Sequence, residues 1–399
     1  MKKVCILVSS NKPVPAVKGG AVETLVQNII DEYEKDTKSQ ISISVLTIKN
    51  IGIDYTKYKK TNFLFIPNFY LKVSPVYWKL TGLVRKLFCK ELLAPSTKVY
   101  ERYFIIRNLK KFDYFIVETD LKSLNTINGI EEHSNKFIYH LHYEGNPSKI
   151  VDSRFSHLIA ISDYIGKVWI KATGRSQERV HILKNCIDVK KFDAELTIDE
   201  INLLKEELGI TERTKVIIFV GRIIEEKGVL ELIQALNIID EKDICLLIIG
   251  SADFAEKTTT SYERKVEAMC RESKHKVIRL GYVDNSNIYR YQVISDIQVV
   301  PSIWQEPAGL VVLEAQAAGL PVIATNVGGI PEFLGNQSGV LVDIDENYIG
   351  NLAKNIERLL NDSDLMKAMG KEGKKFAAMF NSRRYYEDFN SILESIYKS

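Results

Sequence analysis

Residues 299–334 read VVPSIWQEPAGLVVLEAQAAGLPVIATNVGGIPEFL, a stretch that places two carboxylates, Glu306 and Glu314, in apolar surroundings. Pro307 suits the first turn of a helix, and the run that follows it contains no strong helix breaker. We therefore predict a helix over 308–318 that Glu306 caps and that carries Glu314 two turns later. The free backbone N–H groups at the start of this helix attract anions; they belong to Ala308, Gly309, Leu310 and Val311.

Glu314 needs a partner in such a helix, because an unpaired buried carboxylate costs roughly several kcal/mol. Sugar hydroxyls are suitable donors. A ligand with a central diphosphate, a ribose on one side and a hexose on the other would satisfy the helix amides and both glutamates together. The pattern therefore favours a nucleotide sugar, and the alternative is a buried helix whose Glu314 pairs with a Lys or Arg elsewhere.

Four segments in the chain carry a resemblance to a known family. They are Lys18-Gly19-Gly20, Gly221-Arg222 with Lys227-Gly228, Glu306 with Glu314, and 328–332, which reads GGIPE. In this order and spacing the chain resembles the retaining glycosyltransferases of the two-Rossmann-domain (GT-B) type, also described as glycosyl transferases group 1. The resemblance covers nearly the whole chain and is more specific than a single glycine motif.

The resemblance implies roles for residues of the C-terminal half. Arg222 and Lys227 would bind the donor diphosphate, Glu314 the ribose hydroxyls, and Glu306 would lie beside the transferred sugar. Tyr282, after a predicted strand, matches the place where the family holds the nucleotide base, although an aromatic residue at a strand end is more often part of the core. One departure is Ser251-Ala252, which follows Gly250 where the family often has a second glycine.

In the N-terminal half, Gly19 and Gly20 precede a predicted helix, and glycines let the backbone approach a ligand closely. The resemblance implies that this loop faces the diphosphate and the acceptor. His142 ends a predicted strand and matches a family histidine near the transferred sugar, whereas His140 is assigned to the opposite face of that strand. A purely structural His142 is the alternative. The candidate catalytic residues are therefore Glu306, His142, Arg222 and Lys227.

Strands and helices alternate along the chain, which indicates parallel sheets with helices on both faces. The fold class expected is α/β, with two Rossmann-like doubly wound domains that face each other across a cleft and a C-terminal helix that returns to the first domain. We expect an acceptor-binding domain over 1–187, joined by the helix 380–399, and a nucleotide-sugar-binding domain over 188–379. The predicted strands cover 4–9, 41–48, 112–118, 136–142, 157–161, 215–220, 244–249, 276–280 and 339–342.

The composition is that of an ordinary globular enzyme, with 399 residues, 26% charged and 45% apolar. Five scattered cysteines, none in a Cys-x-x-Cys pair, indicate a reducing compartment and no zinc site. No run reaches the ~18 apolar residues of a membrane span, so we expect a cytoplasmic protein whose membrane contact is peripheral, on the inner face.

Two Asp-x-Asp triplets, Asp343-Ile344-Asp345 and Asp362-Ser363-Asp364, could suggest a metal site. We interpret the first as solvated loop carboxylates and Asp362 as the cap of a helix near Leu365. The sequence thus predicts no metal and no other cofactor. Arg222, Lys227 and two helix ends would neutralise the departing diphosphate instead.

Residues 51–111 are the part of the chain that bears on the identity of the acceptor. They hold 13 Lys and Arg against 3 acids, a charge of +10. The whole chain carries +3, so the remainder carries −7. A helix over 76–93 would place basic side chains beside Trp78 and Phe88, which suits an anionic membrane surface. A core-packing helix with a solvated face is an equal alternative, and no nucleic-acid motif accompanies the charge.

From the residues and the resemblance we predict a retaining, metal-independent hexosyltransferase that uses a nucleotide-diphosphate sugar, with a UDP-sugar favoured. The acceptor expected is a glycan or lipid-linked glycan, in cell-surface polysaccharide biosynthesis. Two alternatives stay open: a catalytically silent homologue that binds sugar or stabilises a partner, and a nucleotide-sugar epimerase of the same two-domain shape.

Overall fold

The computed structural model describes residues 1–8, 12–17, 19–68, 70, 96–118, 130–192, 196–252 and 260–398. The chain divides into two compact units. One, the N-terminal unit, contains Met1–Asn185 together with Ser382–Ser399, and the other, the C-terminal unit, contains Cys186–Asn381.

The N-terminal unit is built on a seven-stranded parallel sheet with the strand order β3-β2-β1-β4-β5-β6-β7. Buried strands such as β5, whose five residues are all buried, are typical of a parallel sheet covered on both faces. The strands are β1 (Lys2–Leu7), β2 (Ile41–Ile48), β3 (Asn62–Ile66), β4 (Tyr114–Val117), β5 (Phe137–Leu141), β6 (His157–Ala160) and β7 (Val180–Ile182). The helices are α1 (Ala21–Lys35), α3 (Ser96–Asn108), α5 (Lys149–Asp152), α6 (Asp163–Thr173) and α14 (Ser382–Lys398).

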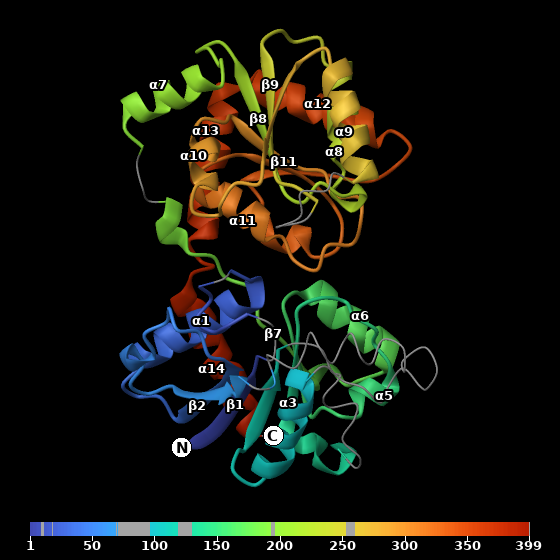
Figure 1. The fold of residues 1–399 in the computed structure, drawn as a ribbon. Coiled ribbons are helices and arrows are strands. Elements are labelled where there is room, and N and C mark those ends of the chain that lie inside the picture. Colours follow the sequence, from blue (N-terminus) through green and yellow to red (C-terminus); the bar gives the residue numbers. More distant parts are fainter. Residues whose placement is uncertain are drawn as a thin grey trace, which may run out of the picture. The chain divides into compact units, whose positions relative to one another are not determined.

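The last helix belongs to the N-terminal unit, although it is the end of the chain. Ser382 Oγ donates to Glu32 Oε1 at 3.1 Å, and Tyr386 Oη donates to Asp36 Oδ2 at 2.9 Å. These contacts hold α14 alongside α1 (Figure 1). The chain thus crosses from one unit to the other twice.

The C-terminal unit is built on a six-stranded parallel sheet with the order β10-β9-β8-β11-β12-β13. Alternate residues of one strand enter different cores: Ile217 and Phe219 pack with α8 and α12, whereas Val216 and Ile218 pack on the opposite face. The sheet is therefore covered by helices on both sides (Figure 1).

The elements of the C-terminal unit alternate along the chain. The strands are β8 (Lys215–Val220), β9 (Ile244–Ile249), β10 (Lys276–Gly281), β11 (Ile297–Val300), β12 (Val322–Thr325) and β13 (Gly339–Val342). The helices are α7 (Ile198–Glu207), α8 (Val229–Ile238), α9 (Ser261–Glu272), α10 (Ile288–Val293), α11 (Leu310–Ala317), α12 (Tyr348–Leu360) and α13 (Ser363–Ala377). Short 3-10 turns include η4 (Val189–Phe192), η5 (Glu225–Lys227) and η6 (Ile330–Phe333).

The α/β fold with two helix-flanked parallel sheets agrees with the sequence-based prediction. The strands over 41–48, 215–220, 244–249 and 339–342 were predicted with the bounds that the structure has. Strand β3 and helix α3 were not predicted, because basic residues interrupt the apolar pattern of residues 51–111 and α3 has no distinct apolar face. The helix predicted over 76–93 lies outside the described residues.

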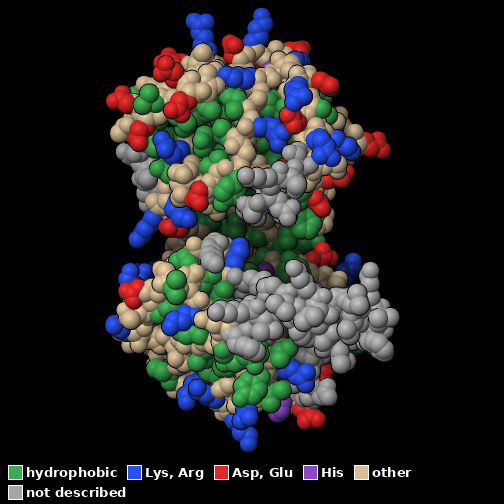
Figure 2. Space-filling model, in the orientation of Figure 1, with side chains coloured by type: hydrophobic (Ala, Val, Ile, Leu, Met, Phe, Trp, Pro, Cys, Tyr) green, Lys and Arg blue, Asp and Glu red, His purple; other side chains and the backbone are tan. Residues whose placement is uncertain are grey.

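The described helices include none that is long and apolar enough to cross a membrane. On the face of the molecule drawn in Figure 2, Lys and Arg side chains are intermixed with Asp and Glu over the C-terminal unit. The four described cysteines, Cys5, Cys186, Cys245 and Cys270, are all free thiols.

Candidate functional site

Five loops of the C-terminal unit meet at the carboxyl end of its sheet, joined by backbone hydrogen bonds. Gly250 N–H donates to Gly281 O at 2.8 Å, and Ile223 N–H donates to Ser251 O at 3.2 Å. On the other side of β8, Ile303 N–H donates to Glu226 O at 2.9 Å. Gly329 N–H, after β12, donates to Glu306 O, after β11, at 2.7 Å. The loops after β10, β9, β8, β11 and β12 therefore form one continuous rim, and this edge of an open parallel sheet is where ligands bind.

Glycines make this close approach of loops feasible. A Cβ on Gly228 would lie 1.9 Å from Pro301 O, and one on Gly250 would lie 1.8 Å from Gly221 O. After β12, a Cβ on Gly328 would lie 2.2 Å from Glu306 O, and the three glycines all have positive φ. Any side chain at these positions would push the rim apart.

Glu306 is held at this rim by two donors. Its Oε1 accepts from Lys227 Nζ and, at 2.7 Å, from Ser302 Oγ. Its main chain is fixed as well, because Glu306 O accepts from Gly329 N–H at 2.7 Å. The Lys227 Nζ also lies 5.8 Å from the centre of the Trp304 ring, in cation–π range. Lys227 and Glu306, both predicted site residues, are thus brought into direct contact.

The predicted capping role of Glu306 is wrong. Helix α11 begins at Leu310, with Gly309 at the N-cap and no side-chain cap. Glu306 lies before the helix in an extended loop, because its carboxylate is bound by Lys227 and Ser302 instead of by helix amides. The helix N–H groups therefore remain available: those of Ala308, Gly309, Leu310 and Val311 donate to no acceptor within the described ranges.

The Glu314 carboxylate, on α11, forms no hydrogen bond or ion pair with any residue that the structure describes. Burial raises the pKa of its carboxyl to about 7, and the positive charge of Lys191 on η4 opposes this rise. The alternative was that Glu314 pairs with a Lys or Arg. Among the described residues Glu314 has no such ion pair, and Lys191 acts on it only through its charge. A carboxyl in this state gains from a ligand that donates hydrogen bonds to it.

Two further predicted residues lie in the rim loops. Arg222 is exposed directly after β8 and forms no ion pair with a described acid, so it contacts neither Glu306 nor Glu314. Tyr282, after β10, is 55% exposed, which argues against the core position that was its alternative. Both side chains are therefore accessible to a ligand.

In the N-terminal unit, Gly19 and Gly20 precede α1 with φ values of 66° and 117°. A Cβ on Gly20 would lie 2.0 Å from Glu23 Oε2, so glycine lets the loop close over that buried carboxylate. Lys18, the first residue of the motif, lies outside the described residues.

His142 is part of a buried cluster at the carboxyl end of the N-terminal sheet. Its Nε2 lies 2.7 Å from Glu118 Oε2, and His140 Nδ1 lies 2.9 Å from the same oxygen. The assignment of His140 to the opposite face was wrong, because residues two apart in a strand share a face. Glu118 and His140, which sequence reasoning missed as a pair with His142, are 0% and 1% exposed.

The pKa values in this cluster follow from the shared carboxylate. Burial alone would raise the pKa of Glu118, but the two histidines lower it to about 2. The pKa of His142 is lowered, first by burial and then by the neighbouring His140, against the opposing influence of Glu118. Glu118 is therefore ionised at neutral pH, and an ionised carboxylate accepts hydrogen bonds but donates none.

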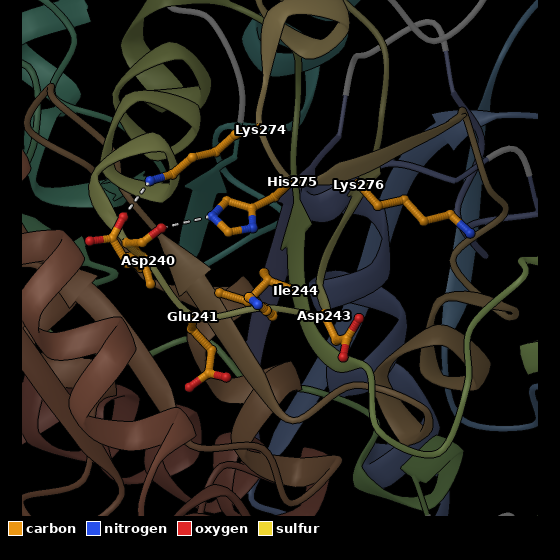
Figure 3. A pocket seen from close by; sticks show the side chains of 9 residues that line it. Asp240, Glu241, Asp243, Ile244, Lys274, His275 and Lys276 are labelled. Carbon is orange, nitrogen blue, oxygen red and sulfur yellow. Dashed lines mark hydrogen bonds and ion pairs between the residues drawn. The ribbon is translucent and has the colours of Figure 1, made fainter.

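A groove of about 500 Å³ lies at the other end of the C-terminal sheet, where β9 and β10 begin (Figure 3). Its charges are largely satisfied within the protein: Lys274 Nζ pairs with Asp240 at 3.0 Å, and His275 Nε2 lies 3.0 Å from Ile239 O. The predicted site residues are not among those that line it.

Both Asp-x-Asp triplets bind protein donors. Asp343 Oδ1 accepts from Asn326 Nδ2 at 2.7 Å, and Asp345 Oδ1 accepts from Asn347 N–H at 2.9 Å. Asp362 accepts from Leu365 N–H at 2.9 Å and caps α13, as predicted. Among the described residues, only Glu118, His140 and His142 form a group whose ligand atoms converge as a metal site requires.

Similar proteins agree with the fold. The chain is 26% identical to the Bacillus subtilis spore coat protein SA over 98% of this chain and 99% of that protein. It is 25% identical to a lipopolysaccharide 1,2-N-acetylglucosaminetransferase of Salmonella typhimurium over 80% and 78%. The crystal structure of Anabaena HepE with UDP and glucose has the same fold, with a TM-score of 0.70, 20% identity, and coverage of 99% and 100%.

The family model described as glycosyl transferases group 1 matches residues 200–376. That range contains all five rim loops, Lys227, Glu306 and the helix that carries Glu314. Residues 200–376 therefore form a glycosyl transferases group 1 domain, which is less than half of the 399-residue chain.

Proposed function

We propose that this glycosyltransferase moves a hexose from a nucleotide-diphosphate sugar to a glycan or lipid-linked glycan, with retention of anomeric configuration and without a metal. One observation carries the proposal. At a single sheet edge, a Lys227–Glu306 pair lies beside a helix start with free N–H groups and a helix that holds the unpartnered Glu314.

Each part of this edge suits one part of such a donor. The α11 N–H groups and the exposed Arg222 suit a diphosphate, since amides and guanidinium are its preferred partners. Glu314 suits the ribose, whose hydroxyls would supply the hydrogen bonds that it lacks. Glu306, fixed by Lys227 and Ser302, suits the hydroxyls of the transferred sugar.

The chemistry follows from charge. Cleavage of the bond between sugar and diphosphate builds negative charge on the leaving oxygen, which Arg222, Lys227 and the helix amides would stabilise. The acceptor would attack on the face that the diphosphate leaves, and a diphosphate oxygen would take the acceptor's proton. A UDP-sugar is the favoured donor, which the similarity to HepE, solved with UDP and glucose, supports at the level of the fold.

The proposal has two further parts. The protein contacts the membrane through residues 51–111, and it takes part in cell-surface polysaccharide synthesis. The relative from Salmonella typhimurium is named as a lipopolysaccharide transferase, which is consistent with a lipid-linked acceptor. Basic charge in residues 51–111 would favour anionic lipid on the cytoplasmic side.

A thermal-shift screen with UDP, GDP, ADP and their sugars tests the donor class, because a ligand that binds the native state raises its melting temperature. We expect UDP and one UDP-sugar to give the largest rise, and Arg222→Ala to abolish most of it. Transfer from that sugar should persist in excess EDTA and should give a product with the donor's anomeric configuration. Inversion, or loss of transfer with EDTA, would contradict the proposal.

The two alternatives make different predictions in the same assay. A silent homologue would bind nucleotide but neither transfer nor hydrolyse the sugar. An epimerase would isomerise the donor sugar with no acceptor present. The contact of Lys227 with Glu306 favours transfer, since a charged pair beside a diphosphate site suits cleavage of the sugar–phosphate bond.

A further inference from the structure

In the cluster of Glu118, His140 and His142, the carboxylate fixes which ring nitrogens carry a hydrogen. The proposed function does not depend on this arrangement. Glu118 directly follows β4, His140 lies in β5 and His142 directly follows β5. The register pairs Val117 with Tyr139, so Glu118 stands beside His140. Two ring nitrogens, His140 Nδ1 and His142 Nε2, meet one carboxylate oxygen, Glu118 Oε2. The side chains come from adjacent parallel strands, so the backbone fixes their approach.

The carboxylate decides which ring nitrogens carry hydrogen. Because an ionised carboxylate can only accept, both His140 Nδ1 and His142 Nε2 must be N–H donors to Glu118 Oε2. In a neutral imidazole the other nitrogen is then a lone-pair acceptor. For His142 that atom is Nδ1, and for His140 it is Nε2.

The two acceptor nitrogens differ in their surroundings. His140 Nε2 is buried and has no partner. His142 keeps 10% of its side chain exposed, and its Nδ1 is not among the buried unpartnered atoms of the described residues. Of the two histidines, His142 is thus the one whose side chain is more open to a ligand, at 10% exposed against 1% for His140.

We propose that Glu118 is a positioning residue that holds His142 as the Nε2–H tautomer, so that His142 Nδ1 accepts a hydrogen bond from a sugar hydroxyl. The identity of the ligand as a sugar rests on the proposed function, whereas the tautomer does not. A carboxylate that fixes an imidazole through one nitrogen leaves the other oriented as an acceptor, as in hydrolase triads. His140 supplies the second N–H that keeps Glu118 in place.

The same three residues could instead hold a divalent cation, since two His and one carboxylate form a common metal-ligand set. The hydrogen-bonded arrangement is favoured because a metal-bound histidine normally donates its other N–H to a partner, and His140 Nε2 has none. The two arrangements predict different protonation at His142 Nε2, so one experiment separates them.

Two-bond ¹H–¹⁵N spectra of ¹⁵N-histidine-labelled full-length protein, near pH 8, report the tautomer directly, and His142→Gln assigns the signals among six histidines. We expect His142 Nε2 to be protonated and Nδ1 unprotonated. In Glu118→Gln, whose amide can also donate, we expect the Nδ1–H form to gain population, whereas Glu118→Asp and His140→Asn should retain Nε2–H. Glu131→Gln, at the exposed Arg154 pair, is the matched charge control.

A wild-type His142 with Nδ1–H, or a tautomer that Glu118→Gln leaves unchanged, would overturn the inference. So would an Nε2 signal that shifts with one equivalent of Zn²⁺ and returns with EDTA. In the transfer assay we expect Glu118→Gln to lower kcat about 10- to 100-fold with little change in donor KM, and Glu118→Asp to recover part of it. If the tautomer changed but kcat did not, His142 would not contact the sugar, and that part of the inference would be wrong. Absence of transfer in the wild type would contradict only the proposed function.

Discussion

Two glutamates at the sites of the two units have pKa values moved in opposite directions, although burial acts on both. Glu118 shares one oxygen between two histidines, and its pKa falls to about 2. The Glu314 carboxylate has no hydrogen-bond partner among the described residues, and its pKa rises to about 7. Glu118 Oε2 therefore takes its hydrogen bonds from the protein itself, whereas the Glu314 carboxylate takes none from the described residues.

The same contrast separates residues within the C-terminal site. Lys227 and Glu306 hold each other, so the atoms beside the transferred sugar would be oriented before the donor arrives. Arg222 and the α11 N–H groups have no such partners in the described structure, so they remain ready for an anion. Preorganised catalytic groups and unpartnered binding groups therefore lie on one rim.

The largest expected effect comes from removing the carboxylate that His140 and His142 share. Glu118→Ala should reduce the free energy of unfolding at pH 7 by about 2–6 kcal/mol, because it leaves two buried imidazole N–H groups without their acceptor, at about 1–3 kcal/mol each. The carboxylate's lowered pKa means that its contribution is present above pH ~4.5 and is lost as pH falls toward 2. Urea unfolding of wild type and variant at pH 7 and pH 3.5 measures this. Equal stabilities at pH 7 would show that the cluster is not a stabilising network.

The next effect tests preorganisation in the C-terminal site. Glu306→Gln should lower turnover roughly 10²- to 10³-fold while nucleotide affinity changes little, because the amide cannot pair with Lys227 as an anion. Initial transfer rates and UDP titrations on the same preparation separate the two quantities. If the variant kept wild-type turnover, Glu306 would have no role in the reaction.

A smaller effect concerns the unpartnered cation. Arg222→Ala should weaken UDP binding about 10- to 100-fold, which corresponds to the loss of one or two charge-assisted hydrogen bonds. Lys274→Ala, in the groove at the opposite end of the sheet, is the matched control and should leave the affinity unchanged. Calorimetric titration distinguishes them. Equal affinities for Arg222→Ala and wild type would place the diphosphate elsewhere.

The smallest effect is a pH dependence of donor affinity at the C-terminal site. If ribose hydroxyls donate to ionised Glu314, the affinity for UDP-glucose should rise about tenfold from pH 6 to pH 8, as a carboxyl with a pKa of about 7 loses its proton. Glu314→Gln should flatten this profile. A wild-type affinity that is constant over the same range would count against a ribose contact at Glu314.

Much of this architecture could be predicted from the sequence, because buried parallel strands are continuous apolar runs that end in glycine. The strands at 215–220 and 244–249, each followed by Gly221 or Gly250, illustrate this. The family resemblance assigned Lys227 and Glu306 to one site, but it did not predict that the two side chains pair directly. Seventy-nine positions separate them, and only the β8–β11 pairing brings their loops together.

The N-terminal cluster was harder to foresee. Glu118 follows a short strand and carries no local signal, and its proximity to His140 depends on the register of β4 with β5. The predicted cap at Glu306 failed for a related reason, since the proline after it suggested a helix start that long-range contacts with Lys227 and Ser302 displaced to Leu310. Local sequence patterns therefore predicted helices and strands, whereas contacts between residues far apart in the sequence determined the geometry of both sites.

The central claim is that Arg222, Glu314 and the start of α11 bind one nucleotide diphosphate together. A crystal structure with UDP tests it most directly. We expect the diphosphate within hydrogen-bond distance of the Arg222 guanidinium and the α11 N–H groups, with the ribose hydroxyls on Glu314. A diphosphate bound away from Arg222, with no ribose contact at Glu314, would contradict the account.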